Sequence, residues 1–119
     1  MQLIAPEKIF RGNGAWLKAL PHIKKFSRRP FLLGRSSSTN NIRQQVFKDL
    51  YVENFSIYSS NLKFDCCDED LGRIRDMILE KNCDSIIAIG GGKVLDAGKF
   101  LSEILSIPVI TVPLSAATC

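Results

Sequence analysis

Short apolar runs alternate along the chain with segments in which hydrophobic side chains recur three or four residues apart. Runs of this kind, bounded by polar or glycine-rich turns, are typical of strands buried in a sheet. They predict strands at residues 8–11, 30–34, 55–58 and 85–89. Because segments long enough for helices lie between them, the order favours an α/β fold. We expect a Rossmann-like parallel sheet with helices on both faces and right-handed crossovers.

The segments with helical spacing predict four helices. Their apolar stripes consist of Trp16, Leu17, Leu20, Ile23 and Phe26; Ile42, Val46, Phe47 and Leu50; Leu71, Ile74, Ile78 and Leu79; and Val94, Ala97, Gly98, Leu101, Ile104 and Leu105. A turn at residues 12–14 precedes the first helix, and Pro21 is expected to divide that helix into two short pieces. Asp68 or Asp70 is the expected cap of the third helix, and Asn82 its end.

The strand at residues 85–89 runs directly into Gly90, Gly91 and Gly92, and the fourth helix follows. A glycine turn lets an anion approach the main chain, and the first amides of the next helix point at it with the positive end of the helix dipole. Lys93 adds a positive charge beside those amides. The stretch therefore predicts a phosphate or pyrophosphate site, although a tight turn selected only for packing is the alternative.

Neither common phosphate motif matches this turn. The dinucleotide fingerprint requires a third glycine where Leu95 stands, and the ATP-type phosphate loop requires Ser or Thr where Val94 stands. The string GGGKVLDAGK instead resembles the pyrophosphate-binding segment of the iron-containing alcohol dehydrogenase and glycerol dehydrogenase family. The matching positions are Gly90, Gly91, Gly92, Lys93, Asp96 and Lys99.

This resemblance implies a fold and an activity. Residues 1–119 would form a single nucleotide-binding domain like the N-terminal domain of dehydroquinate synthase, without the family's helical metal-binding domain. The activity implied is metal-assisted hydride transfer between a small alcohol or carbonyl compound and NAD or NADP. The divalent metal, zinc or iron, belongs to the full-length family member, so we expect the chain alone to be inactive. A homo-oligomer is compatible with the resemblance.

The last stretch, residues 107–119, resembles the family's next strand and its cofactor-facing loop. Leu114 stands where members usually have Thr, which removes one expected hydroxyl contact to the cofactor. Thr118 matches a position where members place a hydroxyl near the nicotinamide. Cys119 stands where glycerol dehydrogenases tend to carry an Asp that contacts the substrate. The substrate is therefore not identified as glycerol.

Two roles suggested by the resemblance stay open. Arg35 follows the second strand, where members commonly hold the adenosine ribose with an acidic residue. Its guanidinium could instead bind the 2′-phosphate of NADP, or it could point into water, so NAD and NADP both remain candidates. Asp96 could orient the glycine turn or could form only a surface pair with Lys99. In a parallel sheet the loops at residues 34–35, 90–92 and 113–114 should meet at one edge.

Composition excludes several other classes. With 16 basic and 12 acidic residues the net charge is +4, but the one basic cluster, at residues 24–29, lacks interleaved stacking aromatics, so no nucleic-acid partner is expected. No run is long enough to span a membrane and no signal peptide is evident, so we expect a cytoplasmic protein. Neither the four cysteines nor the one histidine, His22, make a metal or catalytic set.

Two other functions remain possible. One is a nucleotide-binding module without catalysis. The other is a relative of dehydroquinate synthase or glycerol-1-phosphate dehydrogenase, which shares the fold.

Overall fold

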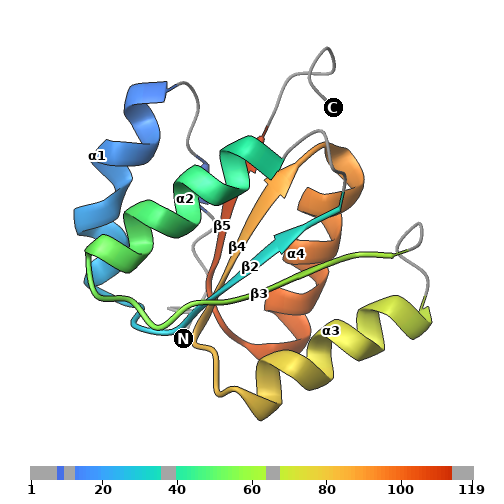
Figure 1. Cartoon of the computed structure of the whole chain (residues 1–119). Helices are drawn as coiled ribbons and strands as arrows, with labels where there is room; N and C mark the ends of the chain where they lie inside the picture. Colours follow the sequence, from blue (N-terminus) through green and yellow to red (C-terminus); the bar gives the residue numbers. More distant parts are fainter. Residues whose placement is uncertain (1–7, 10–12, 36–39, 64–67, 114–119) are drawn as a thin grey trace.

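A computed structural model describes residues 8–9, 13–35, 40–63 and 68–113 of the chain. Helices and strands alternate along it (Figure 1). The elements are β1 (Lys8–Ile9), α1 (Asn13–Lys24), β2 (Pro30–Gly34), α2 (Asn40–Val52), β3 (Tyr58–Asn61), α3 (Asp68–Glu80), β4 (Ser85–Gly90), α4 (Gly92–Leu105) and β5 (Val109–Pro113). None of the described helices is long and apolar enough to cross a membrane.

The strands form one parallel sheet in the order β1-β5-β4-β2-β3. The fully buried strands β2 and β4 lie at its centre, as their continuous apolar runs predict. Gly34 pairs with Asn61 of β3, and Gly90 pairs with Pro113 of β5, so these positions lie together at the carboxyl edge. The α/β class is confirmed, and so is the expected meeting of the three loops as far as the described residues go.

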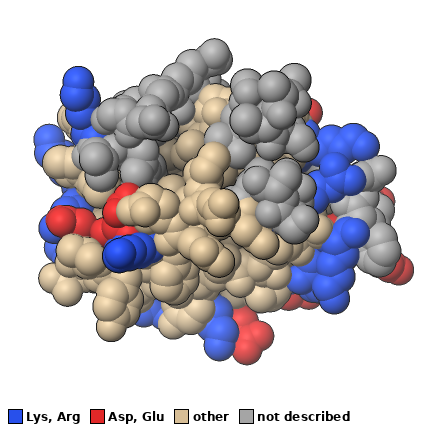
Figure 2. Space-filling view, turned by 45° about the horizontal axis from the view of Figure 1, so that its top comes forward, with Lys and Arg blue, Asp and Glu red and all other residues tan. Residues whose placement is uncertain are grey.

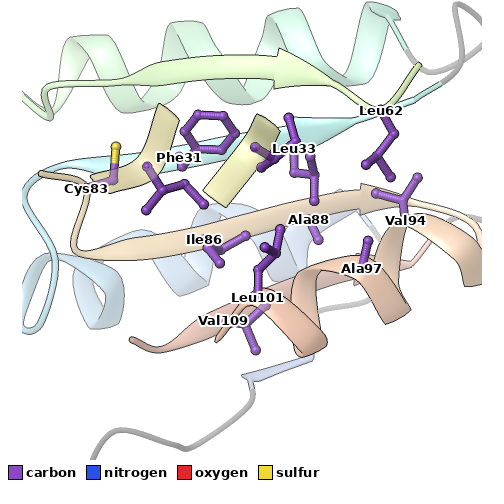
Figure 3. Close-up of a cluster of buried hydrophobic side chains, with 12 residues drawn as sticks. Phe31, Leu33, Leu62, Cys83, Ile86, Ala88, Val94, Ala97, Leu101 and Val109 are labelled. Atoms are coloured by element: carbon purple, nitrogen blue, oxygen red, sulfur yellow. The ribbon is translucent and has the colours of Figure 1, made fainter. Parts of the chain in front are cut away.

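Two apolar layers hold the helices against the sheet. On one face α1 and α2 pack against Leu32, Ile87 and Ile110. On the other face α3 and α4 pack against the side chains of the same strands that point the opposite way, such as Phe31 and Ile86 (Figure 3). Alternate residues of β2 and β4 therefore serve opposite layers, as the two-residue period of a strand requires.

Two predictions near the N-terminus were wrong. The helix begins at Asn13, within the expected turn, and continues through Pro21 as a single helix. Pro21 lies in the last turn, where Leu20 and Ile23 on either side of it are buried against the sheet. That burial outweighs the loss of one main-chain hydrogen bond at the proline.

The third strand was also misplaced, because it is Tyr58–Asn61 rather than residues 55–58. Phe55 is buried, but it lies in the turn after α2 and packs into the apolar layer between the sheet and the helices α1 and α2. β3 lies at the edge of the sheet, where polar side chains are tolerated. Its position is set by hydrogen-bonded pairing with β2 and not by an apolar run of its own.

The expected helix stripes were partly wrong. Phe47, Leu79 and Ile104 are 40%, 57% and 48% exposed, so they lie outside the buried faces. Asp70 lies within the first turn of α3, not at its cap. The end of α3 was correct, because Asn82 has the left-handed backbone (φ 55°) that terminates a helix.

Candidate functional site

The turn between β4 and α4 has the geometry of an anion site. Gly90 has a φ of 148°, which a residue with a side chain adopts only under strain. Gly91 then takes the N-cap position of α4 in an extended conformation (φ −87°, ψ −169°) without a side-chain capping bond. Among the described residues, and apart from its chain neighbours and its own helix backbone, an added Cβ at Gly92 would meet no atom within 4 Å. The first amides of a 14-residue helix therefore lie at the carboxyl edge of the sheet, directly after the glycine turn.

Close packing fixes the direction of this helix. Gly98 lies so near β4 that an added Cβ would stand 2.8 Å from the Cβ of Ala88. Val94 packs over Gly90, where its Cγ2 would be 3.2 Å from an added Cβ. The helix axis, and with it the line along which the amides point, is thus set by the contact of small residues with β4.

Three predicted charges lie near the turn. Lys93 and Asp96 are exposed on the first and second turns of α4, and Arg35 is exposed directly after β2. Leu33 pairs with Ala88, so continuing the register places Arg35 level with Gly90 on the neighbouring strand. Adjacent strands are about 4.8 Å apart. The structure therefore brings Arg35 to the glycine turn, whereas the predicted contacts of Leu114, Thr118 and Cys119 lie outside the described residues.

A second polar region lies one strand further along the same edge. A pocket of about 830 Å³ opens between α2 and the ends of β2 and β3. Its lining includes Arg35, Arg43 and Lys63. Figure 2 turns the carboxyl edge of the sheet toward the reader and shows Lys and Arg side chains on both the left and the right side of that face.

Arg43 was missed in the sequence, although a signal was present. It precedes Val46 by three residues and Leu50 by seven, so it lies on the buried stripe of α2. A cation at such a position is uncommon and indicates a specific contact. Arg43 is 8% exposed, and its guanidinium donates hydrogen bonds to the side-chain oxygens of Asn61 and Asn40. Burial lowers the pKa of Arg43 below its ordinary value.

The loop after β3 is held by a buried carboxylate. Asp70 of α3 is 2% exposed and accepts a hydrogen bond of 2.7 Å from the main-chain N–H of Lys63. It also accepts one of 2.8 Å from Arg73, which in turn donates to the main-chain oxygen of Asn61 (2.6 Å). The main chain that carries Lys63 is therefore fixed at the mouth of the pocket.

The remaining candidates have structural roles or none in the described chain. In the part of the chain that the structure describes, no group of three or more His, Cys, Asp and Glu side chains could hold a metal. Cys83 is buried and reduced. In the basic cluster, Lys24 pairs with Glu53, while Arg29 donates to the main-chain oxygens of Lys81 and Asn82.

Comparison with known proteins agrees with this geometry. The model of the family described as iron-containing alcohol dehydrogenase matches residues 6–119. An oxidoreductase of Synechocystis sp. is 30% identical over 98% of this chain, and the glycerol dehydrogenase of Thermotoga maritima is 28% identical over 97%. The chain spans 30% and 31% of the lengths of these two proteins.

A solved structure shows the same fold. The crystal structure of glycerol dehydrogenase from Schizosaccharomyces pombe superposes with a TM-score of 0.74 at 20% identity. The match covers 91% of this chain and 27% of that protein. The family resemblance predicted from the glycine segment is confirmed: the chain belongs to the iron-containing alcohol dehydrogenase family.

Proposed function

We propose that this chain binds the pyrophosphate of NAD or NADP at residues 90–93 and is the cofactor-binding part of an alcohol dehydrogenase. The observation that carries the proposal is the N-terminus of α4, which begins at Gly92 and whose N-cap residue, Gly91, makes no side-chain capping bond. The first amides of a helix have no acceptor within the helix itself, and phosphate oxygens can accept from several of them at once. As far as the described residues go, the space beside Gly92 leaves room for a phosphate.

Each described residue has a distinct task in this proposal. The amides of Gly92 and Lys93 bind phosphate oxygens, and the Lys93 ammonium adds positive charge from the solvent side. Asp96, one turn further along α4, orients the glycine turn. Arg35 meets the adenosine half of the cofactor at the end of β2. Bound nicotinamide supplies the hydride acceptor or donor, and the protein supplies its position.

The activity of the whole protein is part of the same proposal. The glycerol dehydrogenase relative supports a small alcohol or carbonyl compound as the substrate. We assign residues 1–119 to one nucleotide-binding domain, with Leu114 and Thr118 on its cofactor-facing loop and Cys119 at the threshold of the substrate site. The described residues do not fit a zinc or iron site, so no step of the reaction is routed through a metal on this part of the chain.

Calorimetry with NAD and NADP on the 119-residue chain tests the proposal. Gly92→Val adds a side chain beside the first amides, and its Cβ meets no atom of the described residues outside its own chain neighbours and helix backbone within 4 Å, so it should weaken the binding of both dinucleotides at least tenfold. Gly72→Val is the matched control, because it adds the same side chain to α3, where the nearest atom is the end of Arg75 at 3.8 Å. Equal affinities for Gly92→Val and wild type would overturn the proposal.

A further inference from the structure

The outer edge of β3 has no neighbouring strand among the described elements, because β3 lies at one end of the sheet. In a parallel ladder the main-chain groups of successive residues point to opposite sides of the strand. Leu62 donates to the main-chain oxygen of Gly34 in β2 (2.8 Å), so its N–H points toward β2. The alternation therefore directs the main-chain groups of Ser59, Asn61 and Lys63 toward the outer side.

Two side chains of α3 occupy part of this outer edge. Arg73 donates a hydrogen bond of 2.6 Å to the main-chain oxygen of Asn61. Asp70 accepts one of 2.7 Å from the main-chain N–H of Lys63. A neighbouring strand would offer the same two groups, a donor for the carbonyl and an acceptor for the amide. Over these two residues the side chains of α3 thus take the place of a sixth strand.

The Asp70–Arg73 pair is held firmly in this position. The guanidinium of Arg73 lies 2.8 Å from the carboxylate of Asp70, whose side chain is fully buried. Ser60 Oγ accepts a further hydrogen bond of 3.2 Å from Arg73. A carboxylate is buried at low cost only where a charge and hydrogen bonds compensate it. The two charges and the serine hydroxyl therefore fix the guanidinium against the strand edge.

The remainder of the edge lacks the usual protection. Open edges in natural sheets are commonly guarded by charged residues or proline within the strand. β3, residues 58–61, contains neither. Phe47 of α2 is 40% exposed and lines the same hollow as Ser59, so it offers an apolar contact to any strand that pairs there. A short polar strand of a second copy of this chain fits such an edge.

We propose that the Asp70–Arg73 pair blocks self-association, because it closes an edge at which β3 would otherwise pair with β3 of a second copy. Two copies related by a twofold axis would place these strands antiparallel. Ser59 and Asn61 would then exchange main-chain hydrogen bonds with the same residues of the second copy. This inference does not depend on the proposed cofactor site.

Sedimentation velocity of the 119-residue chain tests the block. Arg73→Met keeps the aliphatic stem but removes the guanidinium that covers Asn61, so it should self-associate at least tenfold more tightly than wild type. Arg75→Met is the matched control, because it removes an exposed α3 arginine whose ion pair is with Asp76 of the same helix (3.1 Å). This control should associate no more than wild type.

A second variant removes both charges of the pair at once. Asp70→Asn combined with Arg73→Met leaves no buried carboxylate at residue 70, and it should self-associate as Arg73→Met does. Circular dichroism checks the fold of each variant. The double variant tests the proposal even if Arg73→Met does not fold.

Ser59→Pro separates edge pairing from misfolding. The N–H of Ser59 points to the outer side, so proline there leaves the ladder with β2 intact and removes a donor from the outer edge. Added to Arg73→Met, it should return self-association to the wild-type level. Hydrogen exchange gives a second measurement: the Ser59 amide should exchange more slowly in associated Arg73→Met than in wild type at the same concentration.

Two results would overturn the proposal. The first is that Arg73→Met and the double variant associate no more tightly than wild type. The second is a tighter association that Ser59→Pro does not reverse, since the contact between copies would then lie away from β3.

Discussion

Gly98→Ala should destabilise the fold, even though alanine is the better helix former. The new Cβ would lie 2.8 Å from the Cβ of Ala88, about 1 Å closer than carbon atoms pack at their optimum. Neither group can rotate away, because each is attached directly to the main chain. Figure 3 shows Ala88 on the side of β4 next to α4. The helix must therefore move away from the strand.

Two opposing effects set the magnitude. Replacement of an interior helix glycine by alanine contributes about 1 kcal/mol to stability. Overpacking of a close-packed interface costs about 1–3 kcal/mol. We expect the overpacking to prevail and the free energy of unfolding to fall by up to about 2 kcal/mol. Urea denaturation of the 119-residue chain measures this change directly.

Gly72→Ala is the control for helix propensity. It lies inside α3, and an added Cβ meets only the end of the Arg75 side chain at 3.8 Å. This variant should gain about 0.5–1 kcal/mol of stability relative to wild type. If Gly98→Ala is as stable as Gly72→Ala, the contact between α4 and β4 does not limit the size of residue 98, and the reasoning fails.

A double-mutant cycle identifies the partner atom. Ala88→Gly removes the Cβ that the new methyl group would strike, and the next neighbour, Val109 Cγ2, stands at an ordinary 3.5 Å. Gly98→Ala should therefore cost less in the Ala88→Gly background, with a coupling energy of about 0.5–3 kcal/mol. Additive effects would show that the strain lies elsewhere.

Three further predictions concern stability and activity. Asp84 accepts hydrogen bonds from Ser27 Oγ (2.7 Å) and from the main-chain N–H groups of Arg28 (2.9 Å) and Arg29 (3.1 Å). Urea denaturation of Asp84→Ala should therefore show a loss of about 2–3 kcal/mol in the free energy of unfolding, and Asp84→Asn should show a smaller loss. An unchanged denaturation midpoint would contradict this prediction. Burial raises the pKa of Cys83 from 9.0 to about 11, although the positive charge of Arg29 acts to lower that pKa. As the pH rises, the thiol of the unfolded chain therefore loses its proton before that of the folded chain. Between pH 9.0 and about 11 the free energy of unfolding of wild type should fall by up to about 3 kcal/mol relative to that of Cys83→Ala. Parallel plots of unfolding free energy against pH for the two proteins would contradict this. The chain alone should not reduce NAD or NADP with glycerol or other small alcohols and added zinc or iron, and turnover that a chelator abolishes would refute this.

The sequence predicted the central unit well because its signals are local. The apolar run of β4, the glycine turn and the helical spacing of α4 lie within one short stretch, and each follows from neighbouring residues. The position of Asn82 at the end of α3 was predicted for the same reason, since the left-handed conformation is a property of one residue.

The errors arose where distant residues determine the structure. β3 has little hydrophobicity of its own, and its position depends on pairing with β2. Pro21 is accommodated because the packing of α1 on the sheet outweighs a local preference. The role of Arg43 could not be predicted either, because Gly34 and Asn61, which shape its position, belong to two different strands.

The strand order places the proposed pyrophosphate site beside a crevice at the carboxyl edge of the sheet. β2 and β4 are adjacent in the sheet, but α2 follows β2 on one face and α4 follows β4 on the other. The two connections thus leave the carboxyl edge in opposite directions, and a crevice opens between them, as is general where an α/β sheet reverses its winding. Main-chain amides lie on the α4 side of this crevice and fixed cations on the α2 side. In the proposed binding mode, a dinucleotide whose pyrophosphate lies at α4 would therefore extend across this crevice toward the end of β2.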